Sequence, residues 1–543
     1  MTTVHDVTHQ LLRELGVTVF FGNPGSTEET FLENFPSDFT YHLALQEASV
    51  IAMADGYAQA TRAPAIVNVH TAAGLGNAMG NLMTAALNKT PLVVTAGQQT
   101  REMLLLEPWL TNVDATVLPR PWVKWSYQPA RAEDVPAAFM RAIATAMQPP
   151  TGPVFLSLPL DDWDKPCARP AAVRTVSTRV APDPFRIKKF AGVLAGASDP
   201  VLILGGAIDR GEGWPAAIAL AERLDVHVWA APACERAPFP EDHRLYLGGL
   251  PFAIGPLCKK LEGHDVALVI GAPVFRYYPF VPGDYLPPGL TLLHISDDPA
   301  ETARAPVGDS LLADPVLAIE ALSLLVASRA SGKRVARQPQ AHRMAPCPPG
   351  QPAGRSPSGM LTPAQVFAAL SEVRPENAVL VEEAPSSLPE LHKWWPITKP
   401  ASFFTFASGG LGWSLPASVG IALGERATGR NRPVLVVIGD GSLQYSVQSL
   451  WNAAQQRLPI VFIVLRNGEY CILKSFAELE RTPGVPGLDI PGIDAVSIAR
   501  GYGCAAERVA DVGAFKALVS QGIAAKSPLL IELPISPDVP RLI

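Results

Sequence analysis

The sequence has few cysteines, little net charge and no long hydrophobic run, and each shortage argues against a class of protein. Six cysteines are scattered over 543 residues without a CxxC pair. This argues against a zinc site or disulfide framework and favours reduced thiols in the cytoplasm. The formal net charge is −6, with no long basic run, so neither a nucleic acid nor an anionic membrane is expected as partner. No apolar run approaches the roughly 18 residues that span a bilayer.

The N-terminal stretch MTTVHDVTHQLLRELG also lacks the apolar segment of a signal peptide. Its apolar residues Val4, Val7, Leu11 and Leu12 recur at helical spacing and predict an amphipathic helix. The whole chain is 48% hydrophobic and 17% charged, as expected for a large globular protein. Its length predicts about three domains.

Short apolar runs alternate with longer amphipathic segments along the whole chain. Runs that are apolar on both faces and end in Gly or a polar turn are typical of buried parallel strands. Alternation of such strands with helices predicts an α/β protein built of doubly wound parallel sheets. The runs are 17–22, 64–70, 91–97, 153–159, 200–206, 266–272, 291–296, 378–383, 434–440, 459–467 and 528–534.

Two stretches interrupt this alternation. Residues 161–190 are rich in proline and charge, and residues 328–360 are rich in Pro, Gly, Arg and Ser, which is typical of linkers. We therefore expect an N-terminal domain at 1–180, a central domain at 181–335, a linker at 336–360 and a C-terminal domain at 361–543.

Two oxygen-bearing side chains follow neighbouring strands of the C-terminal domain. Asp440 stands between two glycines at the end of the 434–440 run, and the next run ends at Asn467. The carboxyl ends of parallel strands form one sheet edge, where α/β sheets bind ligands. A carboxylate and an amide oxygen suit a hard cation such as Mg²⁺, which commonly bridges phosphates. Glycines at such a turn also let backbone amides approach an anion. The segment after Asp440 has helical spacing.

A GDG turn followed 27 residues later by an asparagine turn resembles the thiamine diphosphate (ThDP) enzymes. Further stretches are similar to the benzoylformate decarboxylase family of ThDP-dependent 2-oxo acid decarboxylases, from about residue 4 to residue 535. They include FGNPGSTEETFLENF, NVHTAAGLGNAMG, TNVDATVLPRPWVKWSY, GGLGWSLPASVGIAL and VPGLDIPGID. The resemblance implies a pyrimidine-binding, a central and a diphosphate-binding domain, with ThDP and Mg²⁺ as cofactors. It also implies that each cofactor lies between two subunits, usually of a homotetramer.

The resemblance implies a role for four residues in catalysis. Glu47 would hydrogen-bond the pyrimidine ring and promote its imino tautomer, which removes the thiazolium proton. Ser26 would bind the substrate carboxylate, and His70 would act as acid or base near the substrate carbonyl. Tyr278 stands where the family has a second histidine, and its unperturbed pKa of about 10 makes it a poor proton shuttle.

Other positions are assigned by the same resemblance. Leu411 would bend the cofactor into a V shape. Metal ligands would be Asp440, Asn467 and the main-chain carbonyl of Glu469, while Arg466 replaces a usual asparagine. The remaining cofactor contacts would be Gly409, Gly410, Gly439, Gly441, Ser442 and Tyr470. The substrate pocket would contain Gly25, Trp109, Leu110, Thr405, Ile472, Leu473 and Phe476, with Pro385 among the positions that depart from the family.

These residues predict a ThDP- and Mg²⁺-dependent decarboxylase that converts an aryl, benzoylformate-like 2-oxo acid to the aldehyde and CO₂. A carboligase or acyloin lyase on the same scaffold is the first alternative. Tyr278 and the altered pocket would prolong the life of the enamine that remains after CO₂ is lost, and this would favour its capture by an aldehyde. A non-catalytic protein with this fold is the second, and intact Glu47, Asp440 and Asn467 argue against it. A nicotinamide-dependent dehydrogenase is disfavoured because no GxGxxG motif opens a helix.

Overall fold

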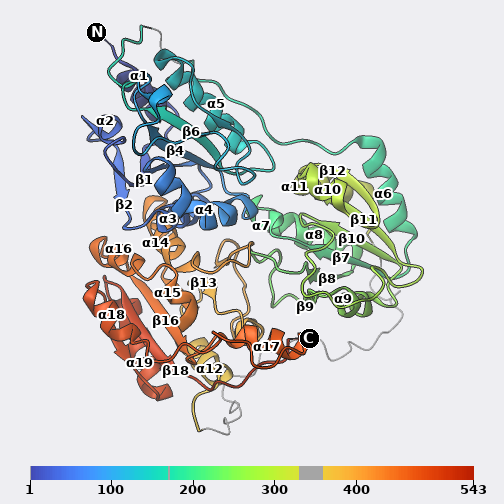
Figure 1. The fold of residues 1–543 in the computed structure, drawn as a ribbon. Coiled ribbons are helices and arrows are strands. Elements are labelled where there is room, and N and C mark those ends of the chain that lie inside the picture. The colour runs from blue at the N-terminus through green and yellow to red at the C-terminus, as the bar shows by residue number, and fades with distance from the viewer. Residues whose placement is uncertain (1, 169–171, 329–358, 543) are drawn as a thin grey trace.

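Three parallel sheets, each flanked by helices, make up the chain in a computed structural model that describes residues 2–168, 172–328 and 359–542. Figure 1 shows the N-terminal sheet at the top, the central sheet at the right and the C-terminal sheet below. The expected α/β class and the three sheets are confirmed. Most of the expected linker, 336–360, lies outside the described residues.

The N-terminal sheet has the order β2-β1-β3-β4-β6-β5. Its strands are β1 (Val19–Asn23), β2 (Thr40–Leu43), β3 (Ala65–Val69), β4 (Leu92–Gln98), β5 (Ser126–Tyr127) and β6 (Val154–Pro159). Its helices are α1 (Val4–Glu14), α2 (Glu29–Leu32), α3 (Glu47–Thr61), α4 (Thr71–Leu87) and α5 (Val135–Met147), with short 3₁₀ turns η1 (Leu104–Leu106) and η2 (Ala132–Asp134).

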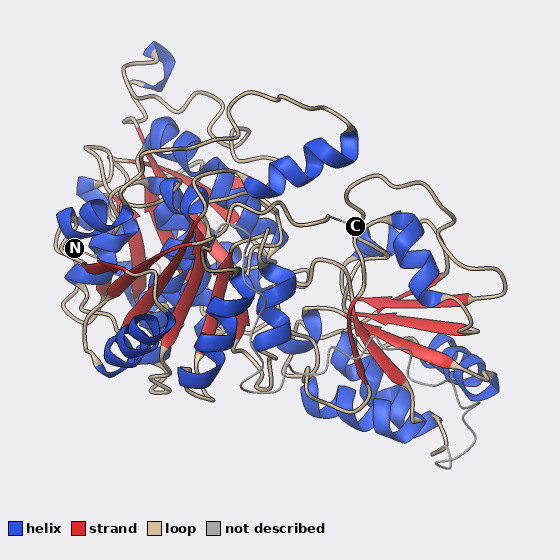
Figure 2. Cartoon of the chain, turned by 90° about the horizontal axis from the view of Figure 1, so that it is seen from below, coloured by secondary structure: helices blue, strands red, loops and turns tan. Residues whose placement is uncertain are grey.

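The central sheet has the order β12-β11-β10-β7-β8-β9. Its strands are β7 (Pro200–Leu204), β8 (His227–Ala230), β9 (Tyr246–Gly249), β10 (Val266–Ile270), β11 (Thr291–Ser296) and β12 (Asp309–Leu312). The helices around it are α6 (Pro184–Gly196), α7 (Ala207–Arg210), α8 (Trp214–Leu224), α9 (Ile254–Leu261), α10 (Pro299–Arg304) and α11 (Pro315–Leu325). Figure 2, from below, shows its strands fanned out at the right.

The C-terminal sheet has the order β14-β13-β15-β16-β18-β17. Its strands are β13 (Val379–Glu383), β14 (Phe403–Phe404), β15 (Val434–Gly439), β16 (Ile460–Arg466), β17 (Ala505–Arg508) and β18 (Leu529–Pro534). Its helices are α12 (Pro363–Val373), α13 (Leu388–Trp394), α14 (Ser414–Ala427), α15 (Asp440–Gln444), α16 (Ser449–Gln455), α17 (Cys471–Glu480), α18 (Ala495–Gly501) and α19 (Val512–Ala524).

All eleven apolar runs form strands, and the four apolar residues of the N-terminal helix are buried in α1. The single helix expected after Asp440 is wrong in its continuity, because α15 ends at Gln444 and α16 starts only at Ser449. The runs did not predict the short strands β2, β5, β8, β9, β12, β14 and β17, all of which except β8 lie at a sheet edge. Within the described residues, no helix is both long and apolar enough to span a bilayer.

Helices α3 and α14 join the first domain to the third at unusually close range. A Cβ added to Gly56 would lie 2.1 Å from the carbonyl oxygen of Ala417, and one added to Gly420 would lie 1.8 Å from that of Met53. Only glycine lets the two backbones approach in this way. The buried side chains of both helices belong to one hydrophobic core shared by the two sheets.

We predict that Gly420→Ala destabilises the protein by about 3 kcal/mol, because the added methyl group forces the helices apart. Gly192→Ala is the matched control, since Gly192 also lies inside a helix but a Cβ there meets no atom within 4 Å. The free energy of unfolding of the control should rise by up to about 1 kcal/mol, because alanine has the higher helix propensity. Urea denaturation measures the free energy of unfolding of both variants. Equal stabilities for the two variants would contradict the close-packing interpretation.

Candidate active site

The expected metal site lies where strands β15 and β16 end side by side. Gly439 is paired with Leu465 in the parallel register, so Asp440 and Asn467 leave the same sheet edge. Asp440 is buried, and its two carboxylate oxygens accept hydrogen bonds from the backbone N–H groups of Gly441 (3.0 Å) and Gly468 (2.8 Å). Burial raises the pKa of this carboxyl, although the backbone N–H groups oppose the shift. A nearby cation would offset the cost of burying the charge.

The two glycines around Asp440 have different explanations. A Cβ on Gly441 would lie 2.6 Å from the Tyr470 ring, so protein packing requires glycine there. A Cβ on Gly439 would meet no protein atom closer than 3.7 Å, so packing does not explain that glycine. A ligand that approaches the backbone closely would account for glycine at this position. Ser442, on the same turn in α15, is buried.

The loop that carries Leu411 is held by a buried carboxylate. Glu383, the last residue of β13, accepts hydrogen bonds from the N–H groups of Gly412 (2.6 Å), Trp413 (3.1 Å) and Ser414 (2.7 Å). It thereby caps the N-terminus of α14 and fixes the end of the loop. Burial raises the pKa of Glu383 to about 7 against these hydrogen bonds. Gly409 and Gly410 precede Leu411, and Gly409 has a φ of 74° that favours glycine.

The first domain presents a second group of polar residues. Ser26 lies exposed in the turn after β1, and His70 is the residue before α4. His70 Nδ1 lies 2.8 Å from Oε2 of Glu28, a fully buried carboxylate. Because an ionised carboxylate only accepts hydrogen bonds, Nδ1 carries the proton and Nε2 is the ring nitrogen available for proton transfer.

Glu28 was not among the expected residues, yet it organises this group. It also accepts hydrogen bonds from the N–H of Gly25 (2.9 Å), the hydroxyl of Thr27 (2.8 Å) and the N–H of Gly97 (2.7 Å). A Cβ on Gly25 would lie 2.1 Å from the His70 ring, so glycine is required there. The sequence offered one clue to Glu28: His70, a histidine at a strand end, needs a carboxylate to orient its ring.

Glu47 begins α3, close to α4. Asn77 Nδ2 donates a hydrogen bond to Glu47 Oε2 at 3.1 Å, and a Cβ on Gly74 would lie 3.0 Å from Glu47 Oε1. Glu47 is half-buried and therefore accessible to a ligand from outside the domain.

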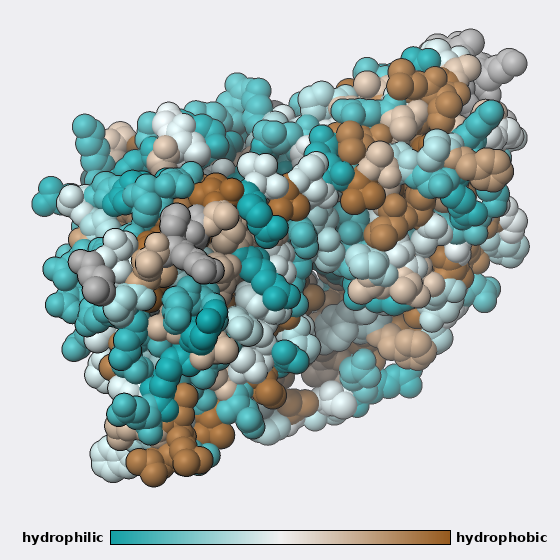
Figure 3. Space-filling view, turned by 90° about the horizontal axis from the view of Figure 1, so that it is seen from above, coloured by the Kyte–Doolittle hydropathy of each residue, from teal (hydrophilic) through white to brown (hydrophobic). Residues whose placement is uncertain are grey.

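The expected substrate residues fall into two sets. Tyr278 of the central domain packs on Phe476 of α17, with ring centroids 4.9 Å apart, and Ile472 and Leu473 lie on the same helix. Trp109 and Leu110 of the first domain are 95% and 47% exposed. Figure 3 shows apolar side chains at the surface of the chain in several patches.

Thr405 has a different environment from the other expected pocket residues. It is buried, and its hydroxyl donates to the side chain of Glu382 at 2.9 Å and to the carbonyl of Glu382 at 3.0 Å. Its hydroxyl is therefore engaged within the protein. Pro385 follows on the turn after β13.

The predicted residues therefore form two groups within one chain. Ser26, Glu47 and His70 belong to the first domain, whereas Asp440 and Phe476 belong to the third. Figure 1 shows α2, which follows Ser26, at the upper left and α17 below the centre. The structure shows His70 beside the turn of Ser26, and Asp440 beside the turn of Asn467.

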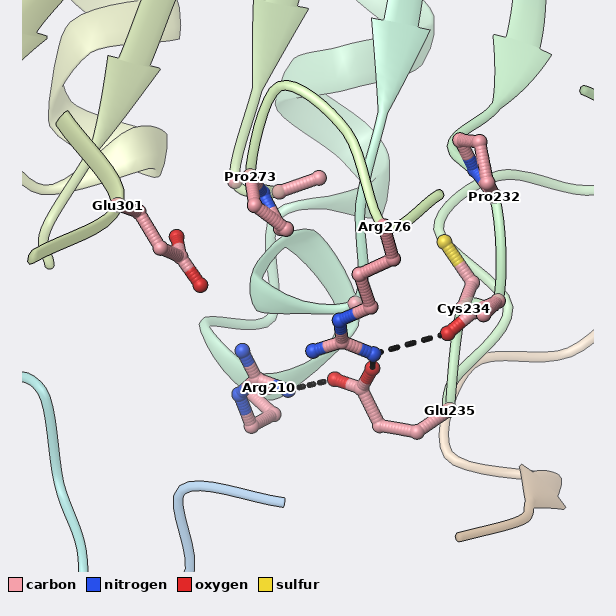
Figure 4. A pocket seen from close by; sticks show the side chains of 11 residues that line it. Arg210, Pro232, Cys234, Glu235, Pro273, Arg276 and Glu301 are labelled. Atoms are coloured by element: carbon pink, nitrogen blue, oxygen red, sulfur yellow. Dashed lines mark hydrogen bonds and ion pairs between the residues drawn. The ribbon is translucent and has the colours of Figure 1, made fainter. Parts of the chain in front are cut away.

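Ion pairs fill the site beyond the carboxyl ends of the central-sheet strands. Figure 4 shows Arg210 and Arg276 converging on Glu235. Burial raises the pKa of Glu235, but the two guanidinium groups outweigh it and lower the pKa to about 2. The cavity that remains is only about 10 Å³, which holds about one water molecule.

The residues that follow the carboxyl ends of β15 and β16 fit ThDP and Mg²⁺. The donor set of Asp440, Asn467 and a main-chain carbonyl has the hard oxygen atoms that Mg²⁺ binds. A Cβ at Gly439 would make only ordinary contacts, with Ser442 Oγ at 3.7 Å and the Glu383 carbonyl at 4.0 Å, so protein packing does not require glycine there. The backbone N–H groups of α15 begin directly after it.

Comparisons with known proteins agree with this geometry. Models of the thiamine pyrophosphate enzymes match the chain as N-terminal TPP binding domain (2–116), central domain (187–322) and C-terminal TPP binding domain (387–533). The chain is 44% identical to benzoylformate decarboxylase of Pseudomonas aeruginosa, over 98% of this chain and 99% of that protein.

Two solved structures are also similar. Benzoylformate decarboxylase from Polynucleobacter necessarius matches with a TM-score of 0.94 and 52% identity, over 99% of this chain and all of that chain. The thiamine diphosphate-dependent 4-hydroxybenzoylformate decarboxylase of Rhodococcus jostii RHA1 matches with a TM-score of 0.93 and 41% identity, with the same coverage.

We predict that Glu383→Gln flattens the dependence of stability on pH. The folded-state pKa of about 7 lies above the ordinary value of 4.5. The carboxyl therefore contributes stability below about pH 4.5 that is lost as pH rises through about 7. Glutamine keeps an acceptor oxygen but cannot ionise. The thermal unfolding midpoint of the variant should therefore fall less than that of the wild type between about pH 5 and about pH 8. Parallel curves for the two proteins would refute the assignment.

Proposed function

The chain belongs to the benzoylformate decarboxylase family of thiamine pyrophosphate enzymes, and on this basis we propose that it decarboxylates an aryl 2-oxo acid. The products would be CO₂ and the aromatic aldehyde, with ThDP and Mg²⁺ as cofactors. Benzoylformate and its 4-hydroxy derivative are the substrates named for its relatives. The observation that carries the proposal is the Glu28–His70 pair beside Ser26, on a chain that also has the metal-binding turn.

ThDP supplies, when bound, the electron sink that makes loss of CO₂ from a 2-oxo acid feasible. The protein must therefore place the substrate, exclude water and move protons. The Ser26 hydroxyl is suited to donate a hydrogen bond to the substrate carboxylate. His70 Nε2, with Nδ1 held by Glu28, is suited to exchange a proton with the substrate carbonyl oxygen.

The other residues would hold the cofactor. Asp440, Asn467 and the Glu469 carbonyl would bind Mg²⁺, and the backbone at Gly439, which carries no side chain, would admit the diphosphate. Glu47 would share a proton with the pyrimidine ring. Leu411 would support the bent shape of the cofactor from a loop whose end Glu383 fixes.

A carboligase or acyloin lyase is the second candidate, and Tyr278 favours it. The phenol is 65% exposed and packs on Phe476, at the position where the family has a histidine. Because a phenol is a weak proton donor near neutral pH, capture of the reaction intermediate by an aldehyde would compete with its protonation.

We further propose that a second copy of the chain completes each active site, within a homotetramer. Ser26, Glu47 and His70 lie in the first domain, whereas the expected metal turn and Phe476 lie in the third. The exposed Trp109 and Leu110 would then be covered by the partner's third domain. A dimer is the smallest assembly that satisfies this arrangement.

A panel of 2-oxo acids supplied with ThDP and Mg²⁺ tests the reaction. We expect CO₂ release from benzoylformate and 4-hydroxybenzoylformate to exceed that from pyruvate by at least about 100-fold, since an aryl group buries more apolar surface in the pocket. Asp440→Ala should abolish the Mg²⁺-dependent activity without unfolding the protein. Cleavage of benzoin without CO₂ release from either aryl acid would favour the lyase instead.

Mixed oligomers test the shared site. Glu47→Gln and Asp440→Ala should each be inactive alone. In a mixed dimer, one site carries both substitutions and the other carries neither, so an equal mixture should recover about one quarter of wild-type activity. Co-expression of the two variants provides the mixture, and its mixed dimers, selected with two affinity tags, should reach about one half of wild-type activity. If sites were complete within single chains, the purified mixture would remain inactive.

A further inference from the structure

We propose that Lys474 is a positioning residue that holds the metal-binding turn by neutralising Glu469. The inference rests on the proposed function, because it concerns the turn that would bind Mg²⁺. Neither the metal nor the substrate needs to touch Lys474. Its effect would pass through the main chain of Glu469.

The turn is paired with a second segment of the chain. The N–H of Tyr470 donates to the carbonyl of Leu488, and the N–H of Ile490 donates to the carbonyl of Gly468, both at 2.8 Å. Glu469 and Asp489 face each other across this short antiparallel bridge. Helix α17 starts immediately afterwards, at Cys471.

Lys474 lies one helical turn into α17 and joins these elements. Its ammonium group pairs with Oε2 of Glu469 and lies 2.7 Å from Oδ1 of Asp489. The Glu469 side chain is only 9% exposed, that of Lys474 is 28% exposed and that of Asp489 is 75% exposed. Glu469 is therefore the member of the trio whose charge most needs a partner.

Removal of the ammonium group would leave a buried carboxylate without its counter-charge. Such a group either destabilises the fold or moves toward water. A displacement of the carboxylate that carries its main chain along would disturb the Glu469 N–H, which donates to Asn467 Oδ1 at 3.2 Å. The same peptide segment supplies the carbonyl assigned to Mg²⁺. Lys474 thus acts on two of the three assigned ligands, Asn467 and Glu469.

The experiment measures binding of ThDP to the purified full-length protein as a function of Mg²⁺ concentration, by calorimetry. Lys474→Met should raise the Mg²⁺ concentration needed for half-maximal binding by about 10-fold or more, the usual effect of losing a residue that supports a metal ligand. Lys474→Arg should stay within about 3-fold of the wild type, because it keeps the charge. Asp489→Asn should have a small effect, since that pair is exposed.

A double variant distinguishes positioning from general stability. If Lys474 acts by neutralising Glu469, Glu469→Gln combined with Lys474→Met should recover most of the Mg²⁺ affinity. Lys516→Met is the matched control, because Lys516 of α19 pairs with Glu372 of α12 at 2.9 Å and neither residue belongs to the turn or to α17. It should leave Mg²⁺ binding unchanged.

The outcomes separate this inference from the proposed function. A wild-type protein that shows no Mg²⁺-dependent ThDP binding would overturn the proposed function. A wild type that binds, together with Lys474→Met that binds equally well, would overturn only the role of Lys474. A variant with a lower melting temperature and unchanged Mg²⁺ affinity would show a merely structural ion pair and would also overturn it.

Discussion

The buried carboxylate of Asp55 is the interaction on which the arrangement of the domains depends. It accepts hydrogen bonds from Gln59, Asn88 and Thr90 of its own domain and from the indole N–H of Trp413 in the third domain. Burial raises its pKa, and the four hydrogen bonds oppose that shift. An unsatisfied carboxylate at this depth would be costly, so the two domains are required to meet in one register.

The same network reaches the central domain. Gln59 accepts a hydrogen bond from Arg236 at 3.0 Å, and Arg236 forms a buried ion pair with Asp209. Asp209 in turn accepts from the N–H of Ala401 in the third domain at 2.8 Å. Helix α3 therefore sets both the N-terminal position of Glu47 and, through Trp413, the loop of Leu411. Rigid support of this kind keeps catalytic groups close to their working geometry.

The sequence predicted the features that depend on local pattern. Central strands are continuous apolar runs, and Asp440 and Asn467 were identified because they follow two such runs. Glu28 could not be recognised in this way, because Glu29 beside it has the same local chemistry and yet is exposed. Only the fold shows that Glu28 faces His70. Short edge strands were missed for a related reason, since they bury too few residues to leave a periodic signal.

Two side-chain contacts meet at helix α17. Tyr278 packs on Phe476 near the middle of α17, and Glu469 is tied to Lys474 one turn after the start of the same helix. A shift of α17 that made room for a different substrate would also strain the pair that supports the metal turn. Under the proposed function, α17 would therefore link substrate preference to metal binding, and substitutions at one end of the helix would constrain those that the other end tolerates.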